Sequence, residues 1–84
     1  MPWRVETSRR ARRDLAGMSV AERAAVEATL KRLAADPSSV DLKKLAGSDG
    51  WRVRVGKWPI LLDLDGPAGV MRVSRVLNRR DAYR

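Results

Sequence analysis

The first half of the chain has hydrophobic spacing that predicts a short strand and then a helix. Residues 3–6 alternate in polarity, as a strand does. Thr7 or Ser8 can then cap a helix, because a hydroxyl accepts from a free amide of the first turn. Gly17 is expected to end this helix. Its predicted buried stripe contains Ala11, Leu15 and Met18.

A second helix is predicted immediately after the first. Ser19 and Glu22 have the spacing of a capping box. The helix is expected to extend to Ala35, because a residue before proline avoids the helical region and Asp36-Pro37 follows. Its predicted inner face contains Val26, Leu30 and Leu33.

The second half of the chain has the period of strands. In residues 51–55, tryptophan and valines alternate with Arg52 and Arg54. Gly56-Lys57 fits a tight hairpin turn into a strand over residues 58–65, and a further strand follows over residues 70–77. The facing of this last strand is ambiguous, since residues of both parities are apolar. Trp51 and Trp58 share the parity of the valines and leucines, so both are assigned to the core.

The order β-α-α-β-β-β predicts a single α+β domain over residues 1–84. We expect the helical hairpin to pack on one face of a small antiparallel sheet. Residues 78–84 are too few for a stable independent element.

The composition excludes several kinds of catalytic and metal-binding site. The chain has 44% hydrophobic and 33% charged residues and contains neither cysteine nor histidine. Disulfides, thiolate ligands, a cysteine nucleophile and a histidine base are therefore excluded. Asp63 and Asp65 share a strand face, but no third ligand is spaced to join them, so no metal or other cofactor is expected. No apolar stretch spans a membrane and no signal peptide is recognised, so we expect a cytoplasmic protein.

The formal net charge of +8 favours a polyanionic partner. Because the helices cover one face of the predicted sheet, Arg52 and Arg54 lie on the other, where they can follow a phosphate backbone. Further candidate RNA contacts are Lys43, Lys44, Lys57, Arg72, Arg75 and Asn78. A second cluster on the first helix, Arg9, Arg10, Arg12 and Arg13, is a candidate for a second phosphate contact or for the site of an acidic protein partner. An ordinary solvated helix face is the alternative for this cluster.

RNA carries its own nucleophile in the 2′-hydroxyl group, so a protein can promote cleavage by orienting it, stabilising charge and moving protons. Arginines supply the first two functions through charge-assisted hydrogen bonds. Tyr83 is the single tyrosine of the chain, and its ring can stack on a base while its phenol exchanges a proton. The alternative is that Tyr83 closes the edge of the core.

Three segments together resemble the RelE/ParE superfamily of toxins. They are residues 42–47 (LKKLAG), 51–58 (WRVRVGKW) and 76–83 (VLNRRDAY). The order of the preceding strand and helices also matches, so the resemblance covers nearly the whole chain. It implies the toxin of a type II toxin–antitoxin pair with a small, acidic or amphipathic antitoxin. RelE-like members cleave mRNA in the ribosomal A site without metal, through attack of the 2′-hydroxyl.

The resemblance assigns catalytic roles to five residues. Arg52 and Arg54 match the strand cations that face RNA, and Arg79, Arg80 and Tyr83 match the C-terminal basic pair and tyrosine. Two positions depart from the family pattern: Pro59 stands where many members have arginine, and Asn78 where many have histidine. These departures leave open a ParE-like toxin that acts on DNA gyrase, or an inactive relic that only binds its antitoxin.

Overall fold

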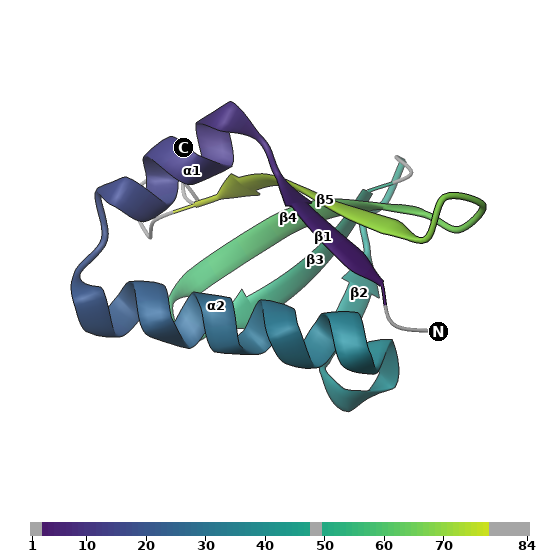
Figure 1. Cartoon of the computed structure of the whole chain (residues 1–84), viewed down its shortest axis with the longest axis horizontal. Helices are drawn as coiled ribbons and strands as arrows, with labels where there is room; N and C mark the ends of the chain where they lie inside the picture. The colour runs from purple at the N-terminus through teal and green to yellow at the C-terminus, as the bar shows by residue number, and fades with distance from the viewer. Residues whose placement is uncertain (1–2, 48–49, 78–84) are drawn as a thin grey trace.

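The computed structural model describes residues 3–47 and 50–77. Two helices lie against a single sheet, with α2 running across one of its faces and α1 near one end of the last strand (Figure 1). The elements in chain order are β1 (Arg4–Thr7), α1 (Arg9–Ala16), α2 (Val20–Ala35), the 3₁₀ turn η1 (Pro37–Ser39), β2 (Leu42–Lys44), β3 (Gly50–Val55), β4 (Trp58–Asp65) and β5 (Val70–Val76). The predicted α+β class is confirmed.

The two helices begin and end where the sequence predicts. Ser8 is the N-cap of α1, and its Oγ accepts a hydrogen bond from the Ala11 N–H at 3.0 Å. Gly17 is the C-cap of the same helix. The capping box of α2 is formed in both directions, with the Glu22 N–H donating to Ser19 Oγ and the Ser19 N–H to Glu22 Oε1. These bonds hold the pKa of Glu22 below its ordinary value.

The sheet has five strands in the order β1-β5-β4-β3-β2. Three neighbouring pairs are antiparallel, but β1 runs parallel to β5, so the sheet is mixed and the expectation of a wholly antiparallel sheet is wrong. The reason is topological, because the chain crosses over through both helices before it returns beside its first strand. The short edge strand β2 was also not predicted, since three residues show no period.

A bulge in β5 lets apolar residues of both parities reach the core. Leu62 of β4 pairs with Val73, but the neighbouring Leu61 pairs with Arg75, so Ser74 is an extra residue on β5. Val73 and Val76 are three residues apart, yet both are almost fully buried in the core cluster. This bulge explains why simple alternation leaves the facing of the strand undecided.

The core lies between α2, the N-terminal part of α1 and the covered face of the sheet. The predicted inward residues of α2 are all buried, as is the valine at the centre of β3. Trp51 and Trp58 are half-buried and pack against this core, as predicted. The opposite face of the sheet is left without a helix (Figure 1).

Candidate functional site

The open face of the sheet carries a cluster of cations on β2 and β3. Arg52 and Arg54 are exposed there because they alternate with Val53, which points into the core. Lys43 of β2 lies directly opposite Arg52. These three cations, named the basic patch from here on, line an open pocket of about 370 Å³ together with Asp41.

The basic patch has little negative charge to balance it. Asp41 lies 3.8 Å from Lys43, but both side chains are more than 60% exposed, so water weakens their attraction. Within residues 3–47 and 50–77, no salt bridge joins Arg52 or Arg54 to a carboxylate. Like charges opposite each other on neighbouring strands destabilise a sheet, and a bound anion removes this repulsion. The patch is therefore suited to an anionic ligand.

Arg72 lies on the same face of the sheet but toward its other edge. Its guanidinium is 3.3 Å from Glu6 and 3.5 Å from Asp65, and Glu6 also pairs with Arg4. The carboxylates largely neutralise the β1–β5 side, so the positive charge of the face is concentrated on β2 and β3. The role of Arg72 as an RNA contact stays a prediction.

Arg75 pairs with Asp14 of α1 and does not line the pocket of the basic patch. Its Nε lies 2.9 Å from Oδ2 of Asp14 and its Nη2 lies 3.2 Å from Oδ1, which forms a bidentate pair between β5 and α1. The side chains of Arg75 and Asp14 are only 26% and 17% exposed. The guanidinium therefore joins β5 to α1, and the role of Arg75 as an RNA contact stays a prediction.

The other two predicted lysine contacts, Lys44 and Lys57, do not line this pocket. Lys44 has the opposite parity, and its Nζ lies 5.7 Å from the ring centroid of Trp51. Lys57 is exposed in the β3–β4 turn. Of these three lysines, Lys43 is therefore the one that lines the pocket.

The predicted C-terminal site residues lie outside the described residues. They are Asn78, Arg79, Arg80 and Tyr83. The last described residue, Leu77, donates its N–H to the carbonyl of Pro59 at 2.9 Å, and Pro59 is the strand partner of Arg54. Two neighbouring strand spacings add to ~10 Å, so Leu77 lies about that far from Arg54.

The arginine cluster of α1 is solvent-exposed. Arg9, Arg10, Arg12 and Arg13 surround the buried Ala11. No salt bridge joins any of the four to a carboxylate in the part of the chain that the structure describes. Positive charge in the first turns of a helix opposes the macrodipole, so this cluster does not stabilise the fold by that route.

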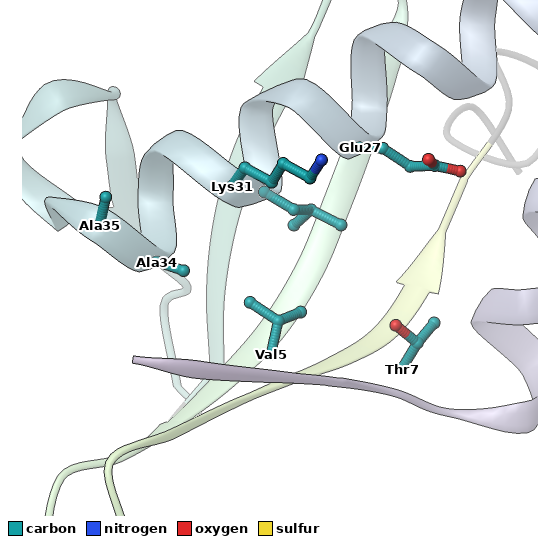
Figure 2. A pocket seen from close by; sticks show the side chains of 7 residues that line it. Val5, Thr7, Glu27, Lys31, Ala34 and Ala35 are labelled. Atoms are coloured by element: carbon teal, nitrogen blue, oxygen red, sulfur yellow. The ribbon is translucent and has the colours of Figure 1, made fainter. Parts of the chain in front are cut away.

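A second pocket, which the sequence analysis did not locate, lies between the edge strand β1 and α2 (Figure 2). It has a volume of about 420 Å³, and Figure 2 shows Val5 of β1 pointing toward α2 across it. Its lining residues are Val5, Thr7, Glu27, Leu30, Lys31, Ala34 and Ala35. The small alanines late in α2 are the sequence signal for such a groove, but only the topology reveals that β1 is an edge strand.

Two general searches of the described residues gave negative results. No group of three or more histidine, cysteine, aspartate or glutamate side chains lies close enough together there to hold a metal ion. None of the helices described is long and apolar enough to cross a membrane.

Comparison with known proteins identifies the fold. No family model matches the sequence, and no curated protein matches it. Among solved structures, the RelBE2 toxin–antitoxin complex of Mycobacterium tuberculosis matches with a TM-score of 0.85 and 27% identity, covering 96% of this chain and 95% of that one. The chain has the fold of the RelE toxins and is similar to them over nearly its whole length.

Two further RelE structures show the same fold at lower identity. The RelE–RelB complex of Pyrococcus horikoshii matches with a TM-score of 0.81 and 20% identity, covering 94% of this chain and 97% of that one. The RelB–RelE complex of Methanococcus jannaschii matches with a TM-score of 0.77 and 22% identity, covering 93% and 94%. The RelE-like architecture therefore extends over almost the whole chain.

Proposed function

We propose that this chain is the toxin of a type II toxin–antitoxin pair and that it cleaves mRNA in the ribosomal A site. The observation that carries the proposal is the basic patch, which lines a pocket and whose arginines have no carboxylate partner within residues 3–47 and 50–77. The solved structures with this fold are described as RelE toxins, which favours RNA over the gyrase target of ParE-like toxins.

The proposed reaction needs only the chemistry of RNA and of this chain. The 2′-oxygen attacks the adjacent phosphorus and the bond to the 5′-oxygen breaks, which leaves a 2′,3′-cyclic phosphate and a 5′-hydroxyl. Arg52 and Arg54 stabilise the negative charge that develops on the phosphoryl oxygens. Tyr83 is the proposed proton-transfer group. The 2′-hydroxyl loses one proton and the leaving 5′-oxygen gains one, so the protons balance. The proposed reaction uses no metal or other cofactor.

The departure at Pro59 has a structural consequence for this proposal. Pro59 pairs with Arg54, so the arginine that many family members carry at this position is absent beside the patch. The neighbouring Arg52 and Lys43 are directly paired and supply two charges on the same face. We propose that these two charges take over part of the phosphate binding.

The proposed activity is tested by inducing the chain in growing cells and mapping mRNA 5′ ends. The expected result is new 5′-hydroxyl ends within translated regions. The Arg52→Ala/Arg54→Ala double variant should lose them, whereas the matched control Arg4→Ala/Arg32→Ala, which removes two exposed cations away from the patch, should keep them. Growth arrest without new mRNA ends would overturn the nuclease proposal and favour gyrase, and absence of arrest would favour a relic.

The proposed partner is a small acidic or amphipathic antitoxin. The groove between β1 and α2 has an apolar lining suited to the apolar side of such a segment, and the arginine cluster of α1 is suited to its acidic side. Two of the solved structures with this fold are described as toxin–antitoxin complexes, which supports a protein partner.

Antitoxin binding is tested with paired substitutions on α2. Ala35→Arg places a long charged side chain at the groove, while Ala24→Arg places the same side chain at an exposed position of the same helix that does not line the groove. We expect the first to weaken the antitoxin complex at least tenfold and the second less than twofold, measured by calorimetry with the product of the adjacent reading frame. Equal effects of the two variants would exclude the groove.

A further inference from the structure

Asp41 is the one carboxylate among the described residues that line the pocket of the basic patch. Its two chain neighbours, Val40 and Leu42, both pack against the core, so the side chain of Asp41 lies on the open face of the sheet. The Leu42 N–H donates to the Val40 carbonyl at 3.0 Å, and this tight turn holds Asp41 directly before β2. The fold therefore fixes the place of this carboxylate from both sides.

The pairing of β2 with β3 arranges the charges around the pocket. Lys43 pairs with Arg52, so one side of the pocket carries two cations. The same register, continued to the residue before β2, places Asp41 opposite Arg54, and both line the pocket. The other side therefore combines one cation with one anion. The volume of about 370 Å³ lies within the range of pockets that hold small ligands.

The fold makes little use of the Asp41 carboxylate. Its Oδ2 lies 3.8 Å from Nζ of Lys43, and 83% of its side chain is exposed, so this pair contributes little to stability. Within residues 3–47 and 50–77, no salt bridge joins Asp41 to Arg54. The two oxygens of the carboxylate are therefore available to a ligand that enters the pocket.

The charge of Asp41 restricts which part of an RNA can lie against it. A carboxylate accepts hydrogen bonds and repels phosphate, so the group that faces Asp41 must be a donor. Guanine is the base whose Watson–Crick edge has two adjacent donors, N1–H and the N2 amino group, which match the two carboxylate oxygens. Adenine and cytosine have an acceptor beside the amino group, and uracil has acceptors on both sides of its N–H, so each of them also repels a carboxylate.

We propose that Asp41 is a specificity-determining residue, which accepts both Watson–Crick donors of a guanine next to the phosphate that Arg52 and Arg54 bind. The inference rests on the proposed RNA binding by the basic patch. The two arginines hold phosphate whatever the sequence, and Asp41 adds the contact that distinguishes bases. A contact of Asp41 with a 2′-hydroxyl, which every nucleotide carries, is the competing explanation.

The test measures the binding of short labelled oligouridines whose central base is G, A, C or U, by fluorescence anisotropy. We expect the native chain to bind the guanine oligonucleotide about tenfold more tightly than the other three, as one bidentate base contact provides. An asparagine amide presents one donor and one acceptor, which fits adenine or cytosine in place of guanine. Asp41→Asn should therefore bind A and C more tightly than G.

Asp63→Asn is the matched control. It removes the same charge from an exposed position of β4, whose side chain lies on the open face but does not line the pocket. This variant should keep the guanine preference of the native chain within twofold. A loss of the preference in both variants would show that overall charge sets it and would overturn the inference.

Three further outcomes would also overturn the inference: equal native affinity for all four oligonucleotides, a guanine preference that Asp41→Asn keeps, and a change in Asp41→Asn that is equal for all four bases. The last would assign Asp41 to the 2′-hydroxyl or to Lys43. Cleavage of mRNA on ribosomes programmed with codons that differ in one base separates the two proposals. Guanine-selective binding with intact mRNA supports the base contact and overturns the nuclease function, whereas cleavage without base preference supports the nuclease function and overturns the role of Asp41.

Discussion

Removing the two arginines of the basic patch should change the salt dependence of RNA binding. Each phosphate that a cation neutralises on single-stranded RNA contributes ~0.7 to the slope of log affinity against log salt. The three patch cations and the two arginines at positions 79 and 80 would give a slope of roughly −3.5. The Arg52→Ala/Arg54→Ala variant should then have a slope of roughly −2.1.

The difference is large enough to measure. Between 50 and 200 mM salt, affinity should fall about 100-fold for the native chain and about 20-fold for the double variant. Fluorescence anisotropy with a labelled RNA that carries 2′-deoxy substitutions measures binding without cleavage. Arg4→Ala/Arg32→Ala is the control for net charge and should keep the native slope.

Two outcomes would refute the reasoning. If the Arg52→Ala/Arg54→Ala slope equals the native one, the patch does not contact phosphates. If the Arg4→Ala/Arg32→Ala variant flattens the slope as much, binding follows the overall charge of +8 and no defined face exists.

Three further predictions concern the fold and the proposed catalytic group. Ser8→Ala should destabilise the protein by more than the ~1 kcal/mol of an ordinary N-cap in urea unfolding, because Ser8 Oγ also donates to Ser74; an effect below that of Ser19→Ala would contradict this. Since the folded pKa of Asp14 is lowered, its stabilisation is present above the unfolded value near 3.8 and is lost as pH falls below it. The melting temperatures of native protein and Asp14→Asn should therefore differ at pH 7 and converge toward pH 2, and a constant gap would exclude this linkage. Tyr83→Phe should slow cleavage on ribosomes ~100-fold at nearly constant RNA affinity if the phenol transfers a proton, whereas native rates would assign the residue to stacking or to structure.

Much of the fold can be predicted from local sequence, because its signals depend on neighbouring residues. The hydroxyl of Ser19 and the carboxylate of Glu22 are three residues apart, and the cap they form needs no other part of the chain. The period of two in β3 likewise places Arg52 and Arg54 on the face opposite Val53.

The features that sequence reasoning missed depend on distant residues. The parallel pairing of β1 with β5 and the three-residue strand β2 are set by where the chain crosses over, which no local period records. Asp14 and Arg75 are 61 residues apart, so the side chain that engages Arg75 could not be read from its neighbours. The bulge at Ser74 interrupts the alternation of inward and outward residues, so the sequence pattern does not show which residues of β5 face the core.

The most direct test of the central proposal is the chemistry of the ends produced by purified protein on ribosomes programmed with a defined mRNA. Attack by the 2′-hydroxyl predicts an upstream fragment ending in a 2′,3′-cyclic phosphate and a downstream fragment starting with a 5′-hydroxyl. The same products should be lost with Arg52→Ala/Arg54→Ala and kept with Arg4→Ala/Arg32→Ala. Intact mRNA, or fragments with 5′-phosphate and 3′-hydroxyl ends, would contradict the account.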